Sequence, residues 1–218
     1  MSQTISWIVG GPRAGTNLIA RILEKSGHFH GGIAPPGNAW NPSFGMDGEL
    51  EGLASCLLGC HPTVGLQIPV RPTTIDPEFL ARFQAVVARQ AALVAPAPYL
   101  LCGAWLPALS AEILATLPPA SYTHKLFVLS RPLASRKASL VARSGASLAD
   151  CTAHIAACDA ARDTLAASFP GTVTTVDFPT IIGKVSDRPG LSAHLQTLLG
   201  FAPTPASLDL IQADAVRF

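Results

Sequence analysis

A glycine-rich segment near the start of the chain carries the strongest chemical signal. Residues 10–17 read Gly-Gly-Pro-Arg-Ala-Gly-Thr-Asn and directly follow the apolar run at 5–9. The next residues, as far as Gly27, place apolar side chains at helical spacing. A strand, a glycine loop and the first turn of a helix direct backbone N–H groups and the positive end of a helix dipole at one point. The segment therefore predicts an anion site, above all for a phosphate.

This loop has the spacing of a Walker A loop but lacks its two functional side chains. Gly10 and Gly15 are spaced as G-x-x-x-x-G, yet Thr16 and Asn17 stand where Lys and Ser/Thr would bind phosphate and magnesium. Ordinary ATP or GTP hydrolysis is therefore disfavoured. Within the loop the positive charge comes from Arg13. An ordinary turn between a strand and a helix is the alternative interpretation of the glycines.

A second candidate anion site lies more than a hundred residues further along. Residues 126–129 predict a central strand, which ends at Arg131 and Pro132, and a helix follows through residue 140. Ser139 comes eight residues after Arg131. The guanidinium offers a planar fork to a phosphate, and the hydroxyl reaches the same anion if the chain curls around it. Taken alone, the pair would equally suit a surface ion pair and a serine facing water.

Together the two segments resemble the sulfotransferases that use 3′-phosphoadenylyl sulfate (PAPS) as donor. Residues 11–16 are similar to that family's 5′-phosphosulfate loop, typically G-x-P-R-S-G-T, and Arg131 and Ser139 match its 3′-phosphate pair. The resemblance implies an α/β, P-loop NTPase-like sulfotransferase fold with a central parallel sheet flanked by helices. It also implies that Arg13 is catalytic. The residues it assigns to PAPS and to the product adenosine 3′,5′-bisphosphate (PAP) are Gly11, Pro12, Arg13, Ala14, Gly15, Thr16, Asn17, Arg131, Ser139 and Phe178.

Carboxylates at the start of a predicted helix are candidates for the general base that takes the acceptor's proton. The stretch from Asn41 to Leu58 resembles the Asn-Pro…Gly-Phe-Trp-Glu…helix segment of small bacterial sulfotransferases. Asp47 stands where that family has Glu, and it is predicted with Glu49 to be catalytic, with Glu51 as a further candidate. Acidic residues at a helix start are also favoured by the dipole without any catalytic role. The remaining alternatives for the base are His28, His30 and His61.

Two departures from the family pattern keep other functions open. Phe178 replaces the Tyr of a typical Tyr-Glu-Asp-Leu strand end, and the acidic pair is missing. The Arg-Lys-Gly segment of eukaryotic cytosolic members is not recognisable, so Arg136, Lys137 or Arg143 would have to supply the missing cation. The alternatives are a P-loop kinase or other nucleotide phosphotransferase, and a non-catalytic binding protein on the same fold.

The amino-acid composition limits the classes of fold and function that are possible. The 218 residues are 49% hydrophobic and 13% charged, with a net charge of +1. These values predict a single domain over 1–218 with a packed core, and they disfavour disorder and nucleic-acid binding. We expect no membrane span, no metal and, with five cysteines and no visible signal peptide, a cytoplasmic location. The acceptor is expected to offer a hydroxyl or amine on a small molecule or glycan, and the oligomeric state is not predicted.

Overall fold

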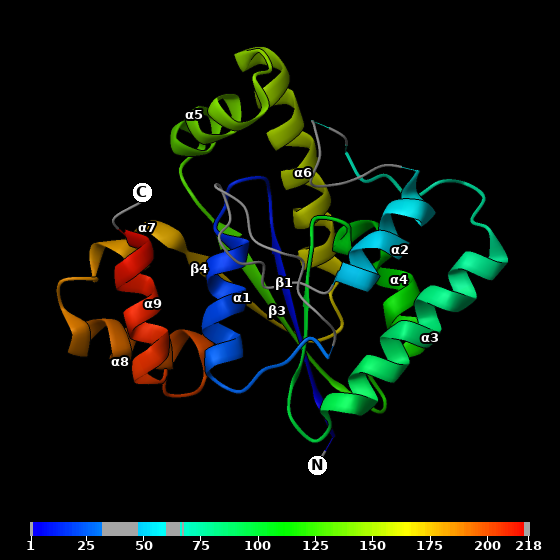
Figure 1. The fold of residues 1–218 in the computed structure, drawn as a ribbon, viewed down its shortest axis with the longest axis horizontal. Coiled ribbons are helices and arrows are strands. Elements are labelled where there is room, and N and C mark those ends of the chain that lie inside the picture. Colours follow the sequence, from blue (N-terminus) through cyan, green and yellow to red (C-terminus); the bar gives the residue numbers. More distant parts are fainter. Residues whose placement is uncertain (1, 32–47, 60–65, 67, 216–218) are drawn as a thin grey trace.

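A parallel four-stranded sheet forms the centre of the computed structural model, which describes residues 2–31, 48–59, 66 and 68–215. The strand order is β2-β1-β3-β4 (Figure 1). The strands are β1 (Thr4–Gly10), β2 (Tyr99–Cys102), β3 (Thr123–Ser130) and β4 (Thr172–Asp177). The predicted α/β class with a parallel sheet is confirmed, and the predicted strands at 5–9 and 126–129 each lie inside an observed strand.

Helices cover both faces of the sheet, as expected for parallel strands (Figure 1). One face carries α1 (Thr16–Lys25), α7 (Phe178–Gly183), α8 (Arg188–Leu199) and α9 (Pro205–Ala215). The other face carries α2 (Gly48–Leu58), α3 (Pro77–Val94), α4 (Leu106–Thr116) and α6 (Leu148–Ser168). None of the helices in the described ranges is long and apolar enough to cross a membrane.

Side chains along β1 alternate between the two faces of the sheet, so this strand packs against both helix layers. Ile5, Trp7 and Val9 pack into the core under α2–α4, whereas Ile8 packs into the core under α1. All four side chains are at most 1% exposed. Burying one such side chain contributes roughly 1.5–3 kcal/mol, so the central strand anchors the glycine loop from both sides.

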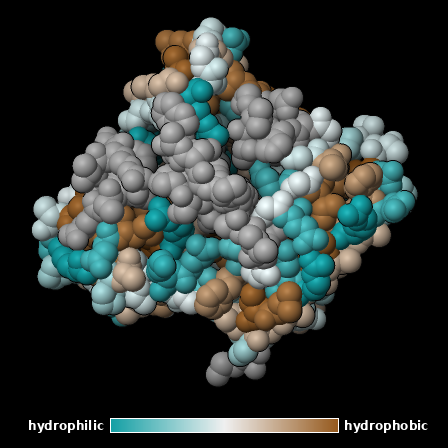
Figure 2. Space-filling model, viewed as in Figure 1, coloured by the Kyte–Doolittle hydropathy of each residue, from teal (hydrophilic) through white to brown (hydrophobic). Residues whose placement is uncertain are grey.

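The remaining helix, α5 (Leu133–Ser144), forms a hairpin with α6 that projects beyond the sheet (Figure 1). The hairpin has its own small cluster of buried residues, Leu140, Cys151 and Ile155. Hydrophobic and hydrophilic residues lie together on the surface of its projecting end (Figure 2). Leu148, at the start of α6, is 59% exposed. Because this cluster is small, the position of α5 also depends on polar contacts with the glycine loop.

Candidate functional site

The loop between β1 and α1 is shaped by two close approaches. A Cβ on Gly11 would lie 2.0 Å from an Arg136 nitrogen and 2.2 Å from an Asp159 oxygen. Gly15 has φ +99°, and a Cβ there would lie 2.5 Å from the Phe178 ring. Glycine is required at both positions, since any larger residue would displace packed side chains or strain the backbone. These are the two glycines of the predicted phosphosulfate loop.

Backbone N–H groups gather where this loop enters α1. Helix α1 begins at Thr16, and its early N–H groups at Leu18 and Ile19 bond to the Gly15 carbonyl. The N–H groups of Gly15, Thr16 and Asn17 have no protein acceptor among the described residues. They form the open N-terminus of a helix, which is an anion-binding arrangement. The sequence predicted this geometry.

Arg13 is the point where the two predicted motifs meet. Its Nε donates to Ser139 Oγ at 2.8 Å, and Arg131 Nη1 donates to the Arg13 carbonyl oxygen at 3.1 Å. The Ser139 hydroxyl accepts that bond and keeps its own proton to donate onward. The structure therefore brings the loop, the end of β3 and the middle of α5 together, although more than a hundred residues separate them in sequence.

Positive charge is concentrated around Arg13. Burial, followed by the nearby charges of Arg143 and Arg131, lowers the pKa of Arg13 from its ordinary value. Burial and the charge of Arg136 likewise lower the pKa of Arg131. Arg13 also has φ +62°, a left-handed conformation that is uncommon for any residue other than glycine. Like charges and a strained backbone at one point favour an anionic ligand that relieves the repulsion.

Arg136 supports the loop from beneath and is not positioned to bind a phosphate. It is 3% exposed, donates from Nε to the Pro12 carbonyl at 3.0 Å, and makes a bidentate pair with Asp159 at 2.7 and 2.8 Å. Arg162 donates to Asp159 at 3.0 Å and to the Leu129 carbonyl at 3.3 Å. Of the residues that the sequence offered as a replacement cation, Arg143 rather than Arg136 lies beside Arg13.

Phe178, which is expected to bind the nucleotide, lies beneath the loop. It is 2% exposed and belongs to the core under α1. One side of it packs against Gly15, and the Arg131 guanidinium lies 5.2 Å from its centroid. The ring therefore contacts both the loop and one of the residues assigned to the 3′-phosphate.

The three candidate carboxylates lie in different surroundings. Asp47 is outside the described residues. Glu49 is half exposed and pairs with Arg89 of α3 at the surface. Glu51 is 6% exposed, and its Oε2 accepts from Trp105 Nε1 at 2.7 Å. Burial raises the pKa of Glu51 from 4.5 to about 7, although the Trp105 bond opposes the shift. Of the two carboxylates that can be placed, Glu49 is therefore engaged in a surface ion pair, whereas Glu51 is buried with a raised pKa.

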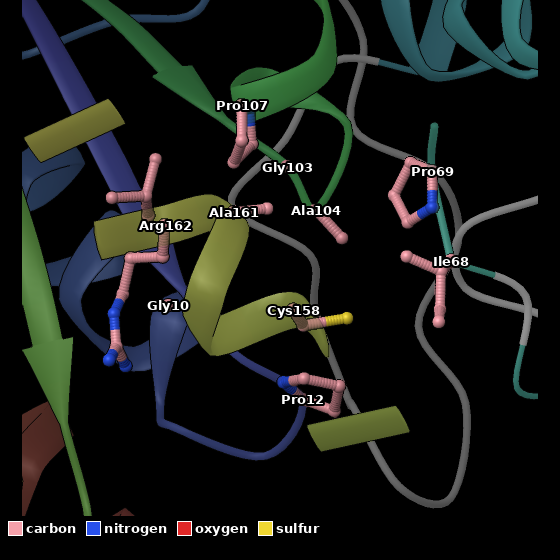
Figure 3. A pocket seen from close by; sticks show the side chains of 11 residues that line it. Gly10, Pro12, Ile68, Pro69, Gly103, Ala104, Pro107, Cys158, Ala161 and Arg162 are labelled. Carbon is pink, nitrogen blue, oxygen red and sulfur yellow. The ribbon is translucent and has the colours of Figure 1, made fainter. Parts of the chain in front are cut away.

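Glu51 lies at the carboxyl end of β2, close to the loop. A Cβ on Gly103 would lie 2.2 Å from Trp105 Nε1, so the indole nitrogen that bonds Glu51 rests directly on Gly103. Gly103 lines a small hollow that also touches Gly10 and Pro12 (Figure 3). A tryptophan nitrogen and one glycine therefore separate the carboxyl group from the hollow beside the loop.

The histidine alternatives lie away from the loop or cannot be placed. His28 is at the amino-terminal edge of the sheet, where burial lowers its pKa to about 4 and its ring contacts Phe201. His30 is 2.9 Å from Glu24 near the end of α1. His61 is outside the described residues. In the described part of the chain, no three or more His, Cys, Asp or Glu side chains are grouped as metal ligands.

The Arg136–Asp159–Arg162 network is the feature that sequence reasoning missed. Asp159 lies 23 residues after Arg136 on another helix, and nothing in the spacing connects them. Arg162 follows Asp159 at i+3, a pairing that is common on helix surfaces. A chemical clue was the second glycine of the loop, since a glycine that neither turns nor caps indicates the close approach of another group.

Comparisons with known proteins find little sequence similarity to this chain. No protein-family model matches the chain, and no curated protein matches it in sequence. Among solved structures, the chain is similar to the sulfotransferase STF1 of Mycobacterium tuberculosis H37Rv, with 14% identity and a TM-score of 0.47. That alignment covers 97% of this chain and 71% of the other.

Proposed function

We propose that the chain transfers a sulfuryl group from PAPS to a hydroxyl or amine of a small-molecule or glycan acceptor. The observation that carries the proposal is the convergence on Arg13. Ser139 accepts from its side chain, and Arg131 donates to its backbone. The two motifs that resemble the donor site in sequence thus share one place in the fold, at the carboxyl ends of parallel strands, where ligands of α/β sheets bind.

Each end of the donor has matching groups. The open N–H groups of Gly15, Thr16 and Asn17 suit the 5′-phosphosulfate at the start of α1. The guanidinium of Arg131 and the hydroxyl proton of Ser139 suit the 3′-phosphate. Arg143, which lies close enough to affect the pKa of Arg13, adds a further positive charge.

The proposed reaction is an in-line displacement at sulfur. The acceptor oxygen or nitrogen forms a bond to sulfur while the bond from sulfur to the bridging oxygen of the 5′-phosphate breaks, and PAP leaves. Negative charge builds on that bridging oxygen, where Arg13 and the loop N–H groups would stabilise it. Such stabilisation acts on the transition state, and one donor contributes about 3 kcal/mol.

The acceptor's proton must go to a base, and we assign that role to Glu51. Of the two described candidate carboxylates, Glu51 is buried and not engaged in an ion pair, and its Oε1 has no hydrogen-bond partner. A carboxylate whose pKa is raised to about 7 is suited to accept a proton near neutral pH. Glu51 is neutral once it has taken that proton, and it would become a carboxylate again when it returned the proton to water.

Calorimetric titration with PAP, beside ATP and ADP with magnesium, tests this function. We expect PAP to bind without metal, and PAP at about 100 times its dissociation constant should add about 2.7 kcal/mol of stability. Arg131→Ala should weaken PAP binding by about tenfold, since a charge-assisted fork to a phosphate is lost. The control is Arg89→Ala, which removes the surface partner of Glu49. A preference for ATP with magnesium would instead indicate a kinase, and binding of neither would reject the site.

A further inference from the structure

The polar network beneath the glycine loop connects the three segments that carry the donor motifs. Arg136, on α5, donates from Nε to the Pro12 carbonyl and from its two terminal nitrogens to Asp159. Asp159 lies on α6, and its Oδ1 also accepts from Arg162 Nη1 at 3.0 Å. Arg162 in turn donates to the Leu129 carbonyl near the end of β3, at 3.3 Å. One turn of α6 therefore reaches the loop through Asp159 and the end of β3 through Arg162.

These contacts lie where the sheet stops fixing the distance between the two motifs. Gly10 and Leu129 are paired in register at the ends of β1 and β3, so up to this pair the sheet sets the separation of the two chains. Beyond it, the glycine loop leaves the sheet. Arg162 bonds to the Leu129 carbonyl, and a Cβ on Gly11 would lie 2.2 Å from Asp159 Oδ1. The α6 side chains therefore contact both chains just past the edge of their pairing.

The same network fixes the strained backbone of Arg13. This residue has φ +62°, and such a conformation persists only where the surroundings hold it. The carbonyl of the preceding residue, Pro12, accepts from Arg136 Nε, and the carbonyl of Arg13 itself accepts from Arg131 Nη1. The two peptide groups that flank the Arg13 Cα are thus each held by one arginine. Arg136 depends on Asp159 for its orientation, because the bidentate pair fixes the plane of the guanidinium.

Stability alone gives little reason for a charged network at this place. The Arg136 side chain is 3% exposed and that of Asp159 is 24% exposed, so both groups lose much of their hydration on folding. A buried ion pair often stabilises a fold no more than apolar side chains of similar volume would. Directional bonds do fix the geometry of the segments that they join, and a site that holds two anionic groups of one ligand needs fixed geometry.

We propose that Asp159 and Arg162 are positioning residues for the donor, which hold the glycine loop and the end of β3 at the separation that one PAPS molecule requires. Asp159 acts on the loop through Arg136, and Arg162 acts through the Leu129 carbonyl on the segment that leads to Arg131. The inference rests on the proposed sulfuryl transfer and deepens it, since it names residues that select a 3′-phosphate over a phosphate at the neighbouring position of the ribose.

Calorimetric affinities of the full chain for PAP and for its isomer adenosine 2′,5′-bisphosphate test this inference. The isomer has the same charge and the same 5′-phosphate, so the ratio of the two dissociation constants measures how strictly the separation is held. We expect the wild type to prefer PAP. Asp159→Asn should lower this preference by about tenfold, the equivalent of one charge-assisted hydrogen bond.

The matched control is Asp163→Asn, the same change one turn further along α6. The Asp163 carboxylate is 64% exposed and also contacts Arg162, so this variant should keep the wild-type ratio. Arg162→Met breaks the bond to the Leu129 carbonyl and leaves the bidentate pair of Asp159 intact, and it should lower the preference several-fold. Partial unfolding of a variant would weaken both apparent affinities by the same factor and leave their ratio unchanged.

A double variant covers the case in which Asp159→Asn fails to fold. Arg136→Met with Asp159→Leu replaces the ion pair by apolar side chains and avoids an unpaired buried charge, so it should be more stable than Asp159→Asn. It should still show the lower preference, because the Pro12 carbonyl has lost its donor. Equal wild-type affinity for the two bisphosphates, or a wild-type ratio in all these variants, would overturn this inference alone. Absence of PAP binding to the wild type would overturn the proposed function as well.

Discussion

Polar groups at the amino-terminal and carboxyl-terminal edges of the parallel sheet lie in different surroundings. At the amino-terminal edge, Gln3 donates to the carbonyl oxygens of Ala91 and Ala97. His124 accepts from Trp7 and lies 2.8 Å from the Leu117 carbonyl. These bonds are between neutral groups that the fold itself supplies.

The carboxyl-terminal edge collects positive charge. Burial and the nearby charges of Arg143 and Arg131 lower the pKa of Arg13, which also adopts a left-handed backbone. Glu51 is buried with one oxygen unpaired among the described residues. Polar groups at the amino edge bond to one another within the fold, and those at the carboxyl edge form the site that we propose for the donor. The difference is expected where parallel strands end.

The largest expected effect at the carboxyl edge follows from removing Arg13. Arg13→Ala should lower turnover by about a hundred- to a thousandfold, because charge on the leaving oxygen loses its main side-chain donor. Turnover is measured as PAP release with an acceptor that the wild type sulfates. Arg21→Ala, on the helix that follows, is the control. Wild-type turnover in Arg13→Ala would remove the catalytic assignment.

A large effect on stability is expected from the network beneath the loop. Asp159→Asn leaves Arg136 without its bidentate partner, so we expect the free energy of unfolding to fall by roughly 3 kcal/mol. Urea denaturation gives that value. Asp163→Asn removes a carboxylate that is 64% exposed and also contacts Arg162, and it should change stability by less than about 0.5 kcal/mol. Equal effects in the two variants would contradict the supporting role.

Opposite pH responses should distinguish the two edges. Glu51 has its pKa raised from 4.5 to about 7, so the folded state holds a proton that the unfolded state has lost, and stability falls as pH rises through this window. The pKa of His28 is lowered from 6.5 to about 4, so between these pH values the unfolded state binds a proton that the folded state does not bind. The free energy of unfolding therefore falls as pH drops through that window.

Two glutamine variants separate these contributions. Relative to the wild type, Glu51→Gln should gain stability as pH rises from 4.5 to 7, and His28→Gln should gain as pH falls from 6.5 to 4. Each relative change should be on the order of 3 kcal/mol. Thermal or urea unfolding across pH 4–8 measures both. Parallel curves for wild type and variant would show that the group titrates alike in the folded and unfolded states.

The smallest expected effect concerns Phe178. Phe178→Leu keeps an apolar side chain under Gly15 but removes the aromatic face beneath Arg131, a contact worth about 0.5–1 kcal/mol. PAP affinity should fall by about two- to fivefold, since 1.4 kcal/mol corresponds to tenfold. Phe127→Leu, in the same core but away from Arg131, controls for lost packing. A loss of more than about a hundredfold would instead support direct contact of the ring with the nucleotide.

Local features were predictable because they follow from local chemistry. The apolar run 5–9 and the glycines after it predicted a strand and a loop leading into a helix, and all three are present. The start of α3 also follows from local chemistry, since Asp76 caps it and Pro77 begins it. The surroundings of Glu49 and Phe178 could not be predicted, because they depend on Arg89 and Gly15, which are distant in sequence.

The amino-acid sequence by itself determined the α/β class, the position of the anion loop and the identity of Arg13, Arg131 and Ser139 as candidates. Glycine spacing and apolar periodicity are short-range properties, so they can be read along the chain. Only the tertiary structure decided that Arg136 and Asp159 support the loop, that Glu51 is buried and that Glu49 pairs with Arg89 at the surface. Burial and pairing set these roles, and both depend on which distant segments the sheet brings together.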